Sequence, residues 1–410
     1  MSSAIVSESA PNQEHPSSPP RVRLASLDVF RGLTVAAMIL VNNPGSWSAI
    51  YPPLKHAEWD GWTPTDLVFP FFLFIVGVSI TFALSRRLAD PSERAGVVGK
   101  IVRRSIIIFG VGVLLSRFPF YHEGQDYRNL DTIRLPDVFA WLANGWKGLR
   151  IPGVLARIAV VYLVTALIFL RTRPKGQMIL AGAILLGYWA LLTLVPVPGY
   201  GAGDLRRGHD ITSYVDRALM PGHLYKKDYD PEGLLSTLPA VATCLSGVLA
   251  GHWLRSGRDR YEIAAGLFVA GLAAILAGTW WGAVYPINKA LWTSSYVLLS
   301  GGLALQGLAA CYWLIDVQGH RKWAGPFLVF GANPLSAFVL AGLFAKLSTL
   351  IKVAGPGGKP VNLHKLIMDW LSSPSWMSPL NASLAYALLF LASCWLVIGV
   401  LHMSGVRLRA

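Results

Sequence analysis

The chain has 410 residues, of which 53% are hydrophobic and only 14% are charged. Soluble domains carry about 25% charged residues, so this composition excludes an ordinary soluble protein, and its apolar content excludes disorder over most of the length. The net charge of +14 comes from short Lys and Arg clusters between apolar segments. No basic stripe with interleaved aromatic residues is present, so we expect no nucleic-acid partner.

Residues 1–20 are rich in Ser and Pro and are expected to form a disordered cytoplasmic tail. Residues 21–410 are expected to form one transmembrane domain, because apolar segments follow that approach the twenty residues needed to cross a bilayer. These segments lie at 26–46, 66–86, 101–117, 151–171, 177–196, 235–254, 262–282, 292–315, 324–346 and 382–403. The fold class is therefore predicted as all-α, a polytopic membrane helix bundle of about ten transmembrane helices.

Basic residues gather in the short connections on one side of the predicted membrane, for example at 86–104, 171–175 and 255–260. The connections on the other side are longer, aromatic and nearly neutral. The positive-inside rule therefore places both chain ends in the cytoplasm. We expect a multi-pass protein of the inner (plasma) membrane.

Two polar features belong to the first apolar segment. Asp28 and Arg31 are three residues apart and share one helix face. They form either an ion pair at the membrane interface or a phosphate-binding group at its cytoplasmic mouth. Asn42 precedes Asn43-Pro44-Gly45, where the helix must end. It is either a plain cap or a hydrogen-bond donor to a substrate carbonyl.

The densest polar cluster is the segment 55–66, which holds one His, three acids and two Trp. Either Thr65 or Thr63, together with Asp66, is placed to cap the following helix, and the Trp residues suit a membrane interface. His56 has neither role, and a histidine of near-neutral pKa is the usual general base. A structural role for His56 remains the alternative.

Arg157 lies inside an apolar segment, where a charge is costly and faces a cavity or an acidic partner. A carboxylate from Asp230 or Glu232 is the expected partner, although both acids also suit the start of the next helix. Lys289 is the only charge in the segment 285–289, where it either binds an anionic or carbonyl group or extends to the interface. The pair Asn333-Pro334 predicts a kink inside the ninth apolar segment.

Five segments, in chain order, resemble the transmembrane acyltransferases related to heparan-alpha-glucosaminide N-acetyltransferase. They are 27–32, 56–77, 153–159, 230–239 and 285–296. The resemblance implies acetyl-CoA as an acyl donor used from the cytoplasmic side, and an amino sugar or glycan acceptor on the periplasmic side of a bacterial membrane. It places His56 on the family's active-site histidine and Asn42 on an asparagine linked to catalysis.

The remaining predicted roles follow from this resemblance and from the clusters above. Donor binding is assigned to Asp28 and Arg31. Substrate binding is assigned to Trp59, Asp60, Asp66, Arg157, Asp230, Glu232, Asn288 and Lys289. No metal is expected, because the three cysteines lie inside apolar segments without a CxxC spacing. The resemblance is compatible with a homodimer.

One departure and two alternatives stay open. Asp60 stands where the family pattern has Asn, so acceptor specificity does not carry over from the resemblance. The same chemistry on a hydroxyl would give an O-acyltransferase. A sugar or lipid transporter, with His56 and Arg157 coupling proton movement, is the alternative without transferase chemistry.

Overall fold

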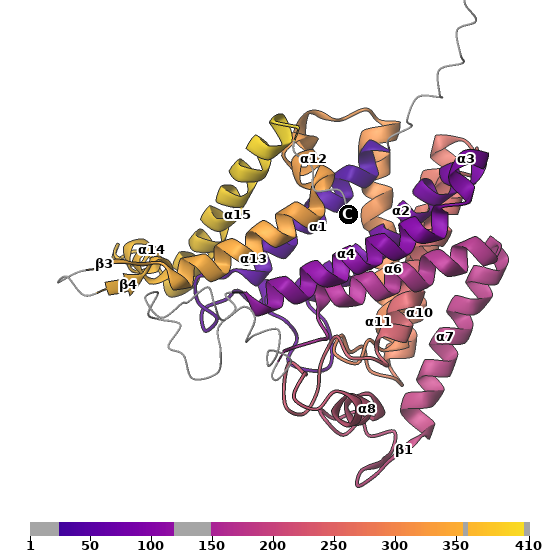
Figure 1. The fold of residues 1–410 in the computed structure, drawn as a ribbon, viewed down its shortest axis with the longest axis horizontal. Coiled ribbons are helices and arrows are strands. Elements are labelled where there is room, and N and C mark those ends of the chain that lie inside the picture. The colour runs from indigo at the N-terminus through magenta and orange to yellow at the C-terminus, as the bar shows by residue number, and fades with distance from the viewer. Residues whose placement is uncertain (1–23, 119–148, 356–359, 406–410) are drawn as a thin grey trace, which may run out of the picture.

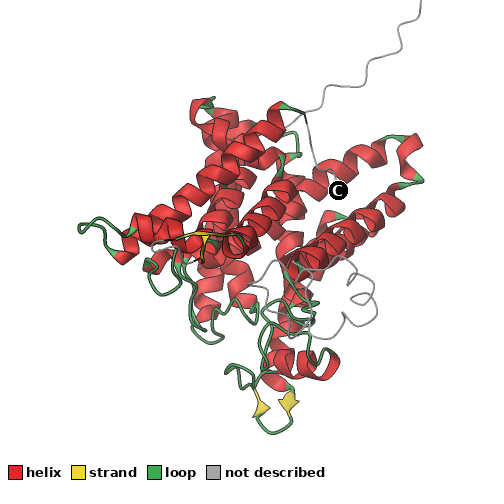
Figure 2. Ribbon diagram, turned by 60° about the vertical axis from the view of Figure 1, so that its left-hand side comes forward, coloured by secondary structure: helices red, strands yellow, loops and turns green. Residues whose placement is uncertain are grey.

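The computed structural model describes residues 24–118, 149–355 and 360–405, and the predicted tail lies outside them. The described chain is a bundle of helices with two short antiparallel hairpins (Figures 1 and 2), as the sequence predicts. The hairpins pair β1 (Pro196–Val197) with β2 (Gly201–Ala202), and β3 (Lys352–Ala354) with β4 (Pro360–Asn362). The long helices are α1 (Ala25–Asn42), α2 (Val68–Ala89), α4 (Val97–Arg117), α6 (Val154–Arg171), α7 (Pro174–Leu194), α9 (Thr237–Leu254), α10 (Arg260–Gly282), α11 (Ser294–Tyr312), α13 (Pro334–Leu350) and α15 (Pro379–Met403). The shorter ones are α3 (Pro91–Arg94), α8 (Ile211–Leu219), α12 (Gly325–Ala332) and α14 (Leu363–Leu371).

Eight helices of the described residues are long and apolar enough to cross a membrane. A ninth span would join the segment that contains α12 to α13, across a bend of 77°. The expected span at 101–117 does form a helix, α4, but its Lys100, Arg103, Arg104 and Arg117 keep it out of this set. With the bent pair counted as one span, the described residues give nine such spans against the prediction of about ten, and α4 is the expected span that is not among them.

The bend between α12 and α13 confirms the predicted kink. Pro334 opens α13 and cannot donate a backbone hydrogen bond into the preceding turn. The Asn333 side chain instead donates to the Val329 carbonyl at 3.3 Å. Half-helices of this kind occur where neighbouring elements satisfy the freed backbone groups.

Small residues bring several helices into backbone contact, as is usual in membrane bundles. A Cβ at Gly331 of α12 would lie 1.9 Å from the Asp28 carbonyl oxygen of α1. A Cβ at Gly77 of α2 would lie 1.9 Å from the Cys244 carbonyl oxygen of α9. These two contacts fix α1 and α2 at the centre of the fold, so the loop that joins them is held at both ends.

Three connections meet at one end of the bundle, in the lower part of Figure 1: 43–63, 195–236 and 283–293. The Trp59 indole donates to the Leu205 carbonyl at 2.9 Å, and the Gly61 amide donates to the Ile287 carbonyl at 2.8 Å. This is the end that the charge distribution of the sequence places away from the cytoplasm. The polar residues that the sequence singles out in these connections are thereby brought together.

Candidate functional site

The connection 43–63 ends in a tight turn that presents Asp66. Residues Pro64–Leu67 form a single 3₁₀ turn, and Thr63 and Asp66 make the reciprocal hydrogen bonds of a capping box, as predicted. The amides of Ala57 and Thr63 both donate to Asp66 Oδ2 at 3.0 Å. One carboxylate oxygen is thus used by the backbone, which leaves Oδ1 for other partners.

Asp66 Oδ1 binds both His56 and Lys289. His56 Nδ1 lies 2.6 Å from it and Lys289 Nζ lies 3.2 Å from it. The Asp66 side chain is 2% exposed, whereas that of His56 is 44% exposed. A buried carboxylate therefore orients a histidine that faces outward.

The three contacts define the tautomer of His56. Lys289 Nζ also lies 3.0 Å from His56 Nδ1. A lysine ammonium can only donate, and the carboxylate at 2.6 Å needs a donor as well, so the consistent arrangement has Nδ1–H and Nζ–H both donating to Asp66. His56 Nε2 then carries the lone pair. It is the atom of this ring that can accept a proton from a substrate.

A strained turn holds Lys289 in place. Trp292 has φ 54°, the only positive φ of a non-glycine residue in the described ranges, and such strain marks positions that the surroundings fix. Asn288 is buried, accepts from the Leu291 amide at 2.9 Å and donates to Asp60 Oδ1 at 3.1 Å. Burial lowers the pKa of the Lys289 ammonium, and the Asp66 carboxylate opposes that effect.

A second charged cluster lies beside the first, and it corrects one expectation. Asp230 and Glu232 do not pair directly with Arg157 but with Arg150, whose Nη2 lies 2.8 Å from Asp230 Oδ1 and also binds the Glu232 carboxylate. Arg157 donates instead to the Gly233 carbonyl at 3.1 Å and to the Ser236 hydroxyl. The sequence therefore identified the acidic segment 230–232 correctly, but it did not identify Arg150 as the arginine that neutralises the two acids.

Arg157 is nevertheless enclosed in the same region. It is 2% exposed, and its guanidinium lies over the Trp292 ring at 5.0 Å. Its Nε and Nη1 have no hydrogen-bond partner among the described residues. Arg157 thus contacts the turn that carries Lys289 and the segment that carries Glu232, and it holds the two together.

Asp216 of α8 supports this segment and escaped the sequence analysis. Its Oδ1 accepts from the Leu234 amide at 2.9 Å. Burial raises the pKa of Asp216 to about 6, and the nearby Asp230 carboxylate adds to the rise. Only its place near Asp230 in the sequence hinted at such a role.

Trp59 is half-buried and fixed between two connections. Beyond its hydrogen bond to Leu205, its indole packs edge-on against Tyr229 with ring centroids 5.4 Å apart. Its place beside His56 in the chain keeps it a candidate for substrate binding.

Asp28 and Arg31 lie elsewhere, against the broken span. Arg31 donates to Asp28 at 3.0 Å, to the Gly331 carbonyl at 2.9 Å and to the Ser79 hydroxyl at 3.2 Å. The predicted ion pair is confirmed. That these residues also bind the acyl donor stays a prediction.

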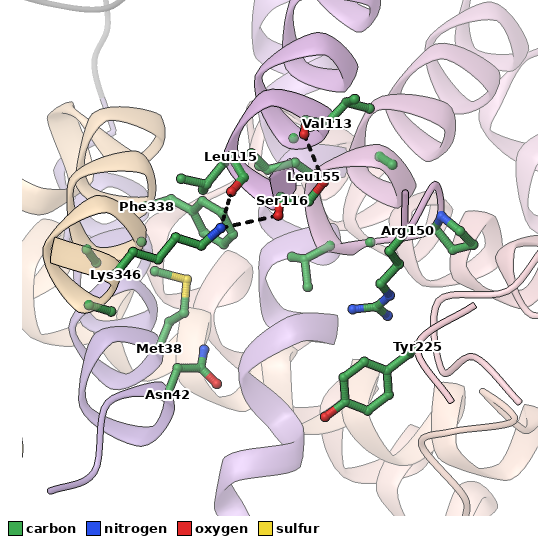
Figure 3. A pocket seen from close by; sticks show the side chains of 18 of the residues that line it. Met38, Asn42, Val113, Leu115, Ser116, Arg150, Leu155, Tyr225, Phe338 and Lys346 are labelled. Atoms are coloured by element: carbon green, nitrogen blue, oxygen red, sulfur yellow. Dashed lines mark hydrogen bonds between the residues drawn. The ribbon is translucent and has the colours of Figure 1, made fainter. Parts of the chain in front are cut away.

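Asn42 is at the C-terminal end of α1, where it lines a cavity of about 550 Å³ (Figure 3). Its side chain is exposed and makes no hydrogen bond to another described residue. Arg150 and Tyr225 also line the cavity, and Lys346 of α13 donates to the Leu115, Ser116 and Phe118 carbonyls at the end of α4. Arg150, Tyr225 and Lys346 were missed from the sequence, although a lysine inside an apolar segment is a recognisable signal.

Within the described residues, no group of three His, Cys, Asp or Glu side chains is arranged to hold a metal ion.

Comparison with known proteins finds similarity to heparan-alpha-glucosaminide N-acetyltransferases. A family model for heparan-alpha-glucosaminide N-acetyltransferase, catalytic, matches residues 23–288. The heparan-alpha-glucosaminide N-acetyltransferase of Homo sapiens is 31% identical over 378 residues, which cover 78% of this chain and 52% of that protein. The protein of the same name from Mus musculus is 31% identical over 370 residues, 77% of this chain and 53% of that protein. The chain spans about half the length of the curated relatives it matches.

Proposed function

We propose that this chain, which belongs to the heparan-alpha-glucosaminide N-acetyltransferase catalytic family, is an acyltransferase of the inner membrane. It takes an acetyl group from acetyl-CoA on the cytoplasmic side and transfers it to an amino sugar or glycan on the periplasmic side. The observation that carries the proposal is the His56–Asp66–Lys289 cluster, with an outward-facing imidazole whose Nδ1 is bound by a buried carboxylate.

In this proposal His56 acts as the general base. Nε2 accepts a proton from the acceptor amine as the amine nitrogen attacks the thioester carbonyl, so that a C–N bond forms. The C–S bond then breaks, and the imidazolium returns the proton to the leaving thiolate. Asp66 stabilises the imidazolium through Nδ1–H. A two-step route, in which Nε2 is itself acylated before the amine attacks, uses the same atoms.

Lys289 is the third member of the cluster and contacts both His56 and Asp66. Its ammonium lies 3.0 Å from His56 Nδ1, so it opposes the positive charge that forms on the imidazole ring. It also holds Asp66 Oδ1 in place. We infer that Lys289, through Asp66 Oδ1, positions the imidazole of His56 for proton transfer.

The substrate-binding roles follow from position. The unpaired carboxamide of Asn42 is suited to donate to the thioester oxygen as negative charge develops there. Trp59 and Asp60 flank the histidine and present an aromatic ring and a carboxylate, groups that suit a sugar ring and an amine. Arg31, held in place by Asp28 at 3.0 Å and near the basic connections of the opposite side, would meet the phosphates of the donor.

The test is acceptor-dependent thiol release from acetyl-CoA by the purified full chain in detergent, with glucosamine as acceptor. His56→Ala should abolish it. His209→Ala is a matched control, because His209 Nδ1 also contacts a carboxylate, Asp204, at 2.9 Å in one of the same connections. Equal loss in both variants, or full activity in His56→Ala, would refute the assignment. Acetyl-CoA binding without thiol release to any amine or hydroxyl sugar would mean that the acceptor is a different one, and absence of acetyl-CoA binding would favour the transporter alternative.

A further inference from the structure

The cavity beside Asn42 is larger than the acetyl group that the proposed reaction transfers. Its volume is about 550 Å³, within the range of about 300–1,000 Å³ typical of ligand sites. At about 30 Å³ for each water-sized group, an acetyl group would fill only a small part of it. The cavity therefore has room for a larger part of a ligand than a two-carbon acetyl group.

The walls of the cavity are chiefly apolar and come from four helices and the segment before α6. Met38 and Ile39 of α1, Leu155 of α6, and Phe338 and Ala341 of α13 line it. In Figure 3 Met38 lies between Asn42 and Lys346, with Tyr225 across the cavity. Such walls favour a hydrocarbon and disfavour a free sugar, whose hydroxyls would lack partners.

The two cations on the wall do not call for an anionic ligand. Arg150 is neutralised by Asp230 and Glu232. Lys346 donates to the Leu115 and Phe118 carbonyls, at 2.6 Å each, and so caps the end of α4. A phosphate or carboxylate entering the cavity would have to displace these internal partners.

Asn42 connects the cavity to the thioester of the proposed reaction. It is the polar side chain of the lining that the proposed function aims at the thioester carbonyl, and it lies one helical turn from Met38 on α1. Whatever is attached to that carbonyl extends from Asn42 along the apolar wall. We propose, on the basis of the proposed function, that this cavity binds the hydrocarbon chain of the acyl donor, and that the enzyme transfers acyl groups longer than acetyl.

The experiment measures kcat/KM for glucosamine-dependent thiol release from acetyl-, butyryl-, hexanoyl- and octanoyl-CoA, using the full chain in detergent. Each buried methylene contributes about 0.8 kcal/mol, about fourfold in kcat/KM. We expect octanoyl-CoA to be used at least as well as acetyl-CoA. In each variant the readout is the ratio of octanoyl to acetyl kcat/KM, which cancels a general loss of active protein.

Ala345 lines the cavity on α13, so Ala345→Phe fills it. This variant should lower the octanoyl-to-acetyl ratio at least tenfold. Ala345→Leu, a smaller change that serves if the Phe variant does not fold, should lower it at least threefold. Ala273→Phe is the matched control, since Ala273 is exposed on α10 and outside the cavity lining, and it should keep the wild-type ratio.

Four results would overturn the inference. If the wild-type enzyme uses acetyl-CoA with a kcat/KM more than a hundredfold above that for octanoyl-CoA, the cavity does not bind an acyl chain, although the proposed function still holds. An unchanged ratio in both Ala345 variants would lead to the same conclusion. If Ala345→Phe instead impairs only acetyl transfer to octyl glucosaminide, the cavity binds the tail of an amphiphilic acceptor. Absence of thiol release from every donor would remove the proposed function and the inference together.

Discussion

Replacing Asp66 with Asn removes the charge that orients His56 while keeping the side-chain shape. Asp66 Oδ1 lies 2.6 Å from His56 Nδ1, and a hydrogen bond to a charged group contributes about 1.5–3 kcal/mol. Loss of that amount from the transition state alone slows turnover about 10–200-fold. The asparagine also no longer stabilises the imidazolium, so we expect kcat to fall by about 10²–10⁴-fold.

The same change also affects folding, and the structure separates the two effects. Lys289 loses its carboxylate partner, and breaking a buried ion pair costs about 3–5 kcal/mol. Asp66→Asn should therefore lower the melting temperature, and the double variant Asp66→Asn/Lys289→Met should restore it, because no unpaired ammonium remains. The double variant should stay as inactive as the single one.

The assay pairs thiol release with a fluorescence melt on the same preparations. Asp204→Asn, at the half-buried second His–Asp contact, is the control. It should change the rate of thiol release by less than about twofold and leave the melting temperature unchanged. Asp66→Asn with kcat within threefold of wild type would refute the role of Asp66. Recovery of activity in the double variant would show that Asp66 serves only to neutralise Lys289.

Three further predictions concern single sites. Burial raises the pKa of Asp216 to about 6, above the 3.8 of an unfolded aspartate, so the folded state holds a proton that the unfolded state releases and stability falls as pH rises from about 4 to above 6. The loss of stability approaches about 3 kcal/mol. Asp216→Asn should therefore have a higher melting temperature than wild type at pH 7.5 and the same melting temperature at pH 4. Equal melting temperatures of the two proteins at both pH values would contradict this. Asn42→Ala should lower kcat about 10²–10³-fold without changing the melting temperature, because the exposed carboxamide makes no hydrogen bond to another described residue; a lower melting temperature would indicate a structural role. Gly331→Ala should destabilise the fold by more than about 1–3 kcal/mol, because the new Cβ meets the Asp28 carbonyl, whereas Gly182→Ala on α7 enters open space and should be neutral in a thermal melt.

Local signals in the sequence predicted the helix ends and caps. Thr63 and Asp66 form the capping box that their spacing predicts, and Asn333-Pro334 breaks a helix as expected. These features depend on residues within one turn, where the backbone geometry of Pro and the hydrogen bonds of short polar side chains decide the outcome. The apolar segments likewise gave the helices, since each must bury a continuous stretch of about twenty residues.

Partners that are distant in the chain were harder to predict. His56 was identified without its partners, although Lys289, 233 residues away, lies 3.0 Å from its ring. Arg157 was singled out because it interrupts an apolar segment, whereas Arg150, seven residues earlier, lies just outside that segment. The position of Asp230 across the end of α6 decides that Arg150 pairs with it, and nothing in the local sequence of either residue contains that information.

Glu232 lies between the two charged clusters and the cavity. It pairs with Arg150, which lines the cavity, and its charge also reaches Lys289, whose ammonium it helps to keep protonated. His56 itself does not line the cavity among the described residues. A ligand that enters the cavity and shifts Arg150 would therefore change the charge felt by Lys289 and, through it, by His56. Under the proposed function, donor binding in the cavity would then affect His56 through the Glu232 carboxylate. Glu232→Gln should weaken this coupling and have a smaller effect on the stability of the fold.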